Sequence, residues 1–242
     1  MWLGIATGAA AAVALGIPFF AKQIPWTWEG ALARQWRPFP NDHLCQLPQP
    51  ATFALQKVVN RLVPVYPNDD FPVHVQIVRH DTINAFATLH GEIFVFQGLL
   101  NQTQSADELA GVLAHEIEHV KRRHIVQGAF TRLLTVGIFS MVFQDGRLDA
   151  RTAEQLLHMK FSRLQESEAD AGGFRRLHDA KVSTDGVENF FNRMETMSST
   201  PTILSDHPAS AERATLAKKF KPKNPAPILT TSEWLALRNA CR

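Results

Sequence analysis

The sequence predicts an α+β fold that is mainly helical, with a small sheet in the first half of the chain and helices in the second. Three observations lead to this prediction. Segment 71–79, FPVHVQIVR, alternates in polarity and is rich in β-branched residues, as strands are. Segment 83–100, INAFATLHGEIFVFQGLL, holds two more short apolar runs around Leu89–Gly91. From Ser105 onward, the segments between the loops are typical of helices.

Length and composition bound the organisation. The 242 residues suit one well-packed domain, and 45% hydrophobic with 20% charged residues is ordinary for a globular protein. A net charge of +2 and the lack of a reader module argue against nucleic-acid binding. We expect four segments: an N-terminal anchor at 1–21, a membrane-proximal linker and helix at 22–50, the main domain at 51–220 and a C-terminal tail at 221–242.

The N-terminus predicts a membrane anchor. Trp2–Ala21 contains twenty residues without a charge, and a helix of that length just spans a hydrocarbon core of about 30 Å. The alternatives are a cleaved signal peptide and a buried core helix. The start carries no charge and Phe19–Ala21 is a poor cleavage site, which favours an uncleaved anchor. Trp26 and Trp28 then suit the membrane interface.

The orientation of the main domain stays open at this point. Lys22, Arg34 and Arg37 follow the anchor, and the positive-inside rule would place the domain in the cytoplasm. Cys45 and Cys241 allow a disulfide that ties the ends of the domain in an oxidising compartment. The alternative is two unrelated thiols.

Helix signals fill most of the remaining chain. Segment 47–67 reads as a helix bracketed by prolines, and Ser105 with Glu108 forms a predicted capping box for a helix that runs to about His124. A helix at about 209–220 and a short one within 232–240 complete the second half.

The helix after Ser105 carries His115-Glu116-Ile117-Glu118-His119. Residues four apart share a helix face, so His115 and His119 can present two ring nitrogens to one metal ion. Glu116 lies beside the first histidine and can take a proton from the water that such a metal activates. The alternative is a surface helix with two hydrogen-bonded histidines.

The third ligand is not the one of the extended HExxHxxGxxH pattern, because Arg122 and Ile125 stand where that pattern needs glycine and histidine. His124 is one position off and is expected to point elsewhere. Glu166 and Asp170 share a face of a later helix. Glu166 can complete a His₂Glu site, and Asp170 can accept a hydrogen bond from a ligand histidine. The alternative is a solvated helix face.

Four motifs carry a family resemblance. VLAHEIEHVKRRH, FSRLQESEAD and LSDHPASAERATLAKK, preceded by INAFATLHGEIFVFQGLL, resemble the membrane-associated zinc peptidases of the HtpX, BepA and CAAX prenyl protease family. The resemblance covers roughly 52–219 and implies a zincin-like domain with its sheet beside the active-site helix. It implies one Zn²⁺ per chain, bound by His115, His119 and Glu166, with Glu116 as the base and Asp170 supporting the ligands.

The same resemblance assigns roles around the cleft. The stretch Asn84, Ala85, Phe86 and Ala87 matches the strand to whose edge a substrate strand can add. His207 and Arg213 match positions near the cleft, where His207 could steady the oxyanion or gate the zinc. The alternatives are a loop histidine beside a proline for His207 and, for Arg213, a structural salt bridge.

The chain departs from the family pattern in three places. Glu118 stands before the second histidine, where small residues are common, and His90 stands where glycine is frequent. The segment between the two ligand-bearing helices lacks a transmembrane hairpin. These departures concern substrate choice and access to the cleft. Glu168, two residues beyond Glu166, is expected to pair with a surface cation.

The sequence therefore predicts a single-pass zinc endopeptidase. The resemblance places it in a bacterial inner membrane with the domain facing the periplasm. It also implies unfolded or misassembled envelope proteins as substrates, as in protein quality control. Two other classes stay open: a zinc-binding chaperone or adaptor with little turnover, and a structural envelope protein with incidental histidines. No oligomeric state is predicted.

Overall fold

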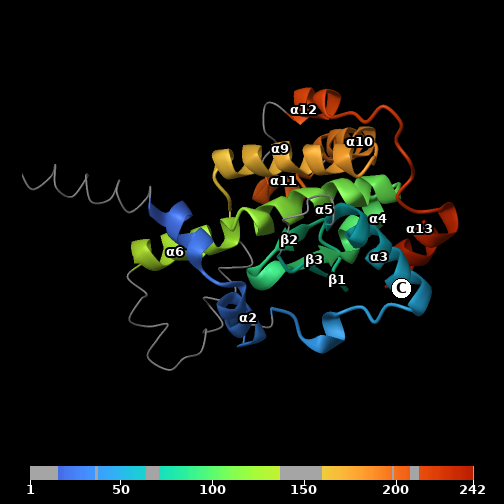
Figure 1. Cartoon of the computed structure of the whole chain (residues 1–242). Coiled ribbons are helices and arrows are strands. Elements are labelled where there is room, and N and C mark those ends of the chain that lie inside the picture. Colours follow the sequence, from blue (N-terminus) through green and yellow to red (C-terminus); the bar gives the residue numbers. More distant parts are fainter. Residues whose placement is uncertain are drawn as a thin grey trace, which may run out of the picture.

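The computed structural model describes residues 16–35, 38–63, 71–136, 160–197, 199–207 and 213–241. Helix α5 (Ala106–Lys121) lies in the middle of the molecule, between a small sheet on one side and α9 (Arg163–Asp179) on the other (Figure 1). The predicted α+β class, mainly helical with a small sheet, is confirmed.

The sheet has three strands in the order β1-β3-β2 within the described residues. Strand β1 (His74–Val78) runs parallel to β3 (Glu92–Phe96), and β2 (Ala85–Ala87) runs antiparallel to β3. All three follow the predicted apolar runs. Strand β2 has β3 on one side and is an edge strand on the other, and this edge faces α5.

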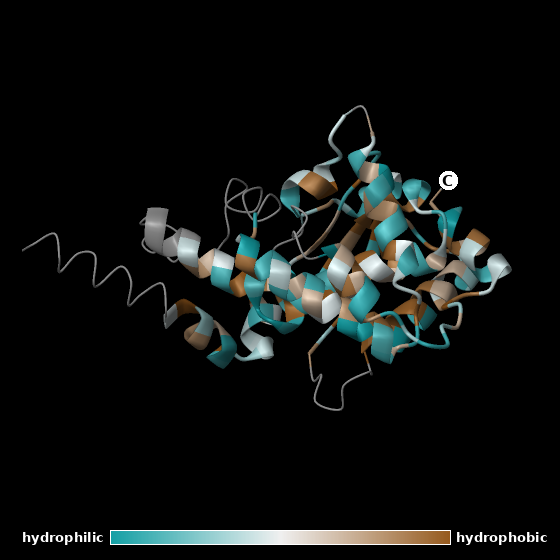
Figure 2. Ribbon diagram, turned by 90° about the horizontal axis from the view of Figure 1, so that it is seen from above, coloured by the Kyte–Doolittle hydropathy of each residue, from teal (hydrophilic) through white to brown (hydrophobic). Residues whose placement is uncertain are grey.

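The remaining described helices lie around α5, α9 and the sheet. They are α2 (Trp26–Gln35), α3 (Gln49–Leu62), α4 (Gln97–Gln102), α6 (His124–Val136), α10 (Asp185–Glu195), α11 (Thr202–Asp206), α12 (Arg213–Lys219) and α13 (Thr231–Arg238), with short 3₁₀ turns at Asn41–His43 and Leu89–Gly91. Most of these helices carry both hydrophilic and hydrophobic stretches (Figure 2). A second, smaller apolar cluster of Val78, Phe86, Phe94 and Phe96 lies apart from the main core.

Helix α5 begins as the sequence predicts and ends earlier. The Ser105 hydroxyl accepts from the backbone N–H of Glu108, which caps the first turn. The Glu108 carboxylate instead accepts from Gln104 N–H and pairs with Arg193, so the reciprocal half of the predicted capping box is absent. The helix ends at Lys121 because Arg123 adopts a left-handed backbone conformation with φ 63°.

Helix α9 packs closely on α5. A Cβ at Gly172 would lie 2.1 Å from Oε2 of Glu118, so only glycine permits this approach. Glu118 is buried, and its Oε1 accepts from Nη2 of Arg176 at 2.7 Å and from Nε at 3.2 Å. The Arg176 guanidinium also donates to the carbonyl of Leu62 on α3. The glutamate that departs from the family pattern is thus part of the bond network between α5 and α9.

The two ends of the domain are tied together. Cys45 and Cys241 form a disulfide with their Cα atoms 5.3 Å apart. Helix α13 packs on α3, where Lys57 and Glu233 form an ion pair at 2.8 Å. The first of the two alternatives for the cysteines therefore holds.

Arg123 holds the N-terminal segment, from Ala21 to Glu29, against the domain. Its guanidinium pairs with the buried Glu29 at 2.8 Å and donates to the carbonyls of Ala21 and Ile24. It also lies 3.8 Å from the ring centre of Trp26. Trp26, predicted at a membrane interface, is therefore half-buried against protein, whereas Trp28 is exposed.

The predicted anchor, Trp2–Ala21, lies mostly outside the described residues, of which only 16–21 belong to it. No helix in the described ranges is both long and apolar enough to cross a bilayer. Residues 16–23 are helical, and the side chains of Phe19 and Phe20 are 63% and 64% exposed.

We expect Glu118→Ala to destabilise the fold by on the order of 3 kcal/mol, because it removes the carboxylate that neutralises the fully buried Arg176. Denaturant unfolding of the variant measures this. The matched control is Lys221→Met, which breaks the exposed Lys221–Asp185 pair and should cost below about 1 kcal/mol. Equal costs in both variants would contradict a stabilising role for Glu118.

Candidate metal centre

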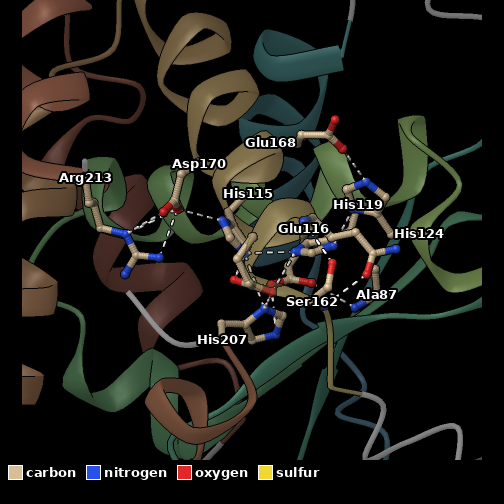
Figure 3. Close-up of polar contacts among 12 residues, drawn as sticks. Ala87, His115, Glu116, His119, His124, Ser162, Glu168, Asp170, His207 and Arg213 are labelled. Atoms are coloured by element: carbon tan, nitrogen blue, oxygen red, sulfur yellow. Dashed lines mark hydrogen bonds and ion pairs between the residues drawn. The ribbon is translucent and has the colours of Figure 1, made fainter. Parts of the chain in front are cut away.

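Four buried side chains from three parts of the chain converge on one point. Figure 3 labels His115, His119 and His207 among them. His115 and His119 come from α5, Glu166 from the first turn of α9, and His207 directly follows α11. One nitrogen or oxygen from each lies within 4.8 Å of all the others. The i, i+4 spacing predicted this for the two α5 histidines.

The separations fit ligands around one small ion. Nε2 of His119 lies 3.0 Å from Nε2 of His115, which lies 3.3 Å from Nδ1 of His207. Oxygens of Glu166 lie 3.4 Å from each α5 histidine and 3.2 Å from His207. Tetrahedral ligands with bonds of about 2.1 Å are about 3.4 Å apart. The four groups therefore surround a space of the size of a tetrahedral metal ion.

A free acceptor in the cluster supports a metal. Oε2 of Glu166 is buried and has no hydrogen-bond partner among the described residues. A buried carboxylate oxygen without a partner is costly unless a cation takes its lone pair. The donor set of two or three imidazoles and one carboxylate is one that divalent transition metals prefer.

His115 is held by a second carboxylate. Its Nδ1 donates to Oδ1 of Asp170 at 3.0 Å, and Arg213 binds the same carboxylate through Nε and Nη2. Burial disfavours a charged ring, but the hydrogen bond to Asp170 and the adjacent Glu166 carboxylate outweigh it and raise the pKa of His115 to about 10. The predicted role of Asp170 agrees with this contact, and Arg213 forms the salt bridge that was its alternative.

The pKa values of His119 and Glu166 are lowered, whereas that of His115 is raised. Burial lowers the pKa of His119 well below its usual value, so this ring is neutral at pH 7. Burial would raise the pKa of Glu166, but its contacts with the three histidines hold it well below the usual range. The site thus combines a neutral imidazole with an ionised carboxylate, the forms in which both bind metals.

Glu116 lies beside the cluster and outside the ligand set. Its Oε2 accepts from the backbone N–H of Ala87 at 2.9 Å, and its Oε1 is 3.6 Å from Nε2 of His207. Burial raises the pKa of Glu116, and the nearby imidazoles only partly offset this effect. A carboxylate with a raised pKa is suited to accept and return a proton near neutral pH.

The predicted substrate strand lies next to Glu116. Phe96 N–H bonds to Asn84 C=O and Thr88 N–H to Glu92 C=O, so alternate residues of this strand face β3. The backbones of Ala85 and Ala87 therefore face the free edge. Their N–H groups donate to Asn84 Oδ1 and to Glu116.

The other two residues predicted at this strand have different surroundings. The ring of Phe86 packs in the separate aromatic cluster with Phe94 and Phe96, away from the metal cluster. The amide of Asn84 donates to Asp206 on α11 at 2.9 Å. Asp206 was not among the residues predicted near the site.

His124 stays outside the ligand cluster, as expected, but it contacts a ligand histidine, and Glu168 has a different partner from the one predicted. Nδ1 of His124 lies 3.0 Å from Nδ1 of His119, and Nε2 of His124 lies 3.2 Å from Oε2 of Glu168. The contact between His124 and His119 was not predicted, and Glu168, expected to pair with a surface cation, pairs with His124 instead. The HxxxxH spacing from His119 was the available signal, but it only matters if the helix breaks between the two residues.

These features define the class of protein. A helix with His-Glu-x-x-His beside a strand edge, completed by a glutamate from a second helix, is the site of a metallopeptidase domain. Residues 51–221 match the model of peptidase family M48, and the chain belongs to this family. The predicted family resemblance is therefore confirmed.

Individual relatives agree with the family. The mitochondrial metalloendopeptidase OMA1 of Schizosaccharomyces pombe is 30% identical over 182 residues, covering 72% of this chain and 54% of its own length. The β-barrel assembly-enhancing protease of Yersinia pestis is 28% identical over 195 residues (73% and 40%), and the metalloprotease LoiP of Escherichia coli 29% over 153 residues (59% and 60%). The chain spans about half the length of these curated relatives.

We expect Zn²⁺ binding at pH 7 to release about one proton, because the pKa of His115 is raised to about 10 and its Nε2 must lose a proton to bind a metal. Calorimetric titration in two buffers of different ionisation enthalpy measures the release, and the affinity should rise with pH. Asp170→Asn removes a carboxylate that raises the pKa of His115 and should reduce the release. Identical heats in both buffers would contradict the expectation.

Proposed function

We propose that this chain is a zinc-dependent endopeptidase with one Zn²⁺ per chain. The observation that carries the proposal is the buried oxygen of Glu166 that has no hydrogen bond and lies among the ring nitrogens of His115 and His119, with Glu116 beside them. These three ligand groups would hold the ion. Zinc, when bound, supplies a Lewis acid that polarises a carbonyl oxygen and lowers the pKa of water toward 7.

Glu116 acts as the general base in this proposal. The N–H of Ala87 fixes one carboxylate oxygen, which leaves the other directed toward the cluster. Its raised pKa suits a group that takes a proton from the attacking water and returns it to the leaving amine. Asp170 keeps the ring of His115 in the orientation in which Nε2 faces the ion.

The substrate would bind as an added strand along β2. The outward N–H groups of Ala85 and Ala87 are the donors that a peptide backbone would use. Both are engaged by side chains, Asn84 and Glu116, in the structure. Binding of a substrate strand therefore exchanges these internal hydrogen bonds for bonds to the peptide, with a scissile bond placed next to Glu116.

His207 acts as a gate. Its Nδ1 lies 3.3 Å from His115 and 3.2 Å from Glu166, so it stands at the fourth position of the ligand set. A catalytic zinc site needs that position for water or substrate. The ring must therefore move aside before hydrolysis, which favours the gating role over the oxyanion role.

The substrates are proposed to be unfolded or misassembled envelope proteins. Of the relatives, one is a bacterial β-barrel assembly-enhancing protease, one is a bacterial metalloprotease, and one is a mitochondrial metalloendopeptidase. The Cys45–Cys241 disulfide suits an oxidising compartment, which supports a periplasm-facing domain. Residues 2–21 would anchor it to a bacterial inner membrane, with exposed Phe19, Phe20 and Trp28 near the interface.

A zinc-binding chaperone or adaptor is the second candidate. It is favoured by the same observation that makes His207 a gate, because a ligand set closed by a fourth side chain leaves no position for water. Turnover separates the two functions.

We expect Glu116→Gln to retain zinc and to cleave unfolded casein at least about 10²-fold more slowly than the wild type, because the general base is lost. Full-length chains in detergent are compared for zinc content and for cleavage of labelled casein. The control is Glu195→Gln, an exposed position on α10, which should match the wild type.

Two other combinations of zinc content and cleavage would argue against the enzyme. Zinc in both chains without cleavage in either would favour the chaperone. Wild-type protein without stoichiometric zinc would remove the basis of the enzyme proposal.

We expect His207→Ala to raise kcat/KM for casein severalfold, because the fourth position no longer has to be vacated. Initial rates of the wild type, His207→Ala and the exposed control His43→Ala measure this. A fall in kcat with unchanged KM would instead assign the ring to the oxyanion.

A further inference from the structure

His119 has a second contact on the side of its ring that faces away from the ligand cluster. Nδ1 of His124 lies 3.0 Å from Nδ1 of His119, and Nε2 of His124 lies 3.2 Å from Oε2 of Glu168. Figure 3 draws this series of contacts from Glu168 through His124 to His119. The three residues come from three helices: Glu168 from α9, His124 from the start of α6 and His119 from α5.

The contacts fix where the protons lie. Nε2 of His119 faces the ligand cluster and needs its lone pair for a metal, so the ring proton is on Nδ1. Nδ1 of His124 must then be the acceptor, because two N–H groups would repel at 3.0 Å. The proton of His124 is therefore on Nε2, where it donates to the carboxylate of Glu168.

We propose that His124 and Glu168 are positioning residues for the metal ligand His119, with His124 holding its tautomer and ring orientation and Glu168 holding those of His124. This inference rests on the proposed zinc site and extends it. It gives His119 the support that Asp170 and Arg213 give His115.

Burial makes these contacts effective. The side chains of His119 and His124 are 0% and 1% exposed, so solvent does not compete for their ring nitrogens. The ring of Phe161 stacks on His119 with centroids 4.0 Å apart and blocks rotation on one face. Hydrogen bonding through Nδ1 then decides the remaining freedom of the ring.

The two supports differ at their outer ends. Asp170 is buried and bound by Arg213, whereas the Glu168 side chain is 43% exposed. We therefore expect zinc affinity to fall strongly when His124 loses its acceptor atom and less when the Glu168 side chain is removed.

The test compares His124→Asn with His124→Leu in the full chain. The two side chains are nearly equal in size, and Asn places an oxygen acceptor where Nδ1 of the imidazole stands. Zinc dissociation constants are measured by competition with a chromophoric chelator, and the Co²⁺-loaded chains are compared by visible absorption, which reports ligand geometry. Thermal unfolding of the metal-free chains reports folding.

We expect His124→Leu to weaken zinc binding about 10–100-fold and to alter the Co²⁺ spectrum. His124→Asn should stay within about 3-fold of the wild type, because the acceptor is kept, and Glu168→Ala should fall between the two. The control His43→Leu, at an exposed histidine, should change neither readout.

Equal zinc affinity and spectra in His124→Leu and the wild type would overturn the proposal, as would an equal loss in His124→Asn and His124→Leu. If His124→Leu fails to fold, Glu168→Ala decides, because that side chain is half-exposed. These readouts do not depend on cleavage, so absence of peptidase activity leaves the inference standing. A wild type that binds no zinc overturns both this inference and the proposed function.

Discussion

The pairing of every buried polar group on α5 is the constraint on which the site depends. This helix is buried almost throughout and still carries Glu108, His115, Glu116, Glu118 and His119. Each buried polar side chain needs a partner, and most of the partners for those on α5 come from other elements. The partners come from α9, α10, the edge of β2 and the start of α6. The fold around α5 is therefore arranged by the same contacts that assemble the ligand cluster.

The sequence predicted the parts of the site that depend on local geometry. His115 with His119, and Glu166 with Asp170, share helix faces at a spacing of four, and the helical period alone places them correctly. His124 could not be predicted this way, because residues five apart on a continuous helix point about 140° apart. The left-handed turn at Arg123 redirects it, and no glycine in the sequence marks that turn.

Distant contacts explain what the sequence does not show. Arg123 is held by Glu29 and by carbonyls of residues 21 and 24, about a hundred positions earlier. The N-terminal segment therefore fixes the turn from which α6 starts, and α6 begins with His124. Through this turn, the docking of a segment predicted to lie near the membrane is mechanically connected to a contact on His119. The position of His207, likewise, depends on α11, and the helical period of the sequence does not predict it.

Helix α11 and the residue after it contact three parts of the site that a substrate would need: the strand edge, the fourth ligand position and the base. Its Ile203 N–H bonds to the carbonyl of Ile83 beside the strand edge, and its Asp206 holds the amide of Asn84. His207 follows directly and stands in the ligand cluster, 3.6 Å from the base Glu116. A displacement of this short helix would release the strand edge, the fourth ligand position and the base in a single movement. In the proposed enzyme, a substrate strand that adds to β2 would therefore favour the same displacement that opens the metal, because both compete with the same α11 contacts.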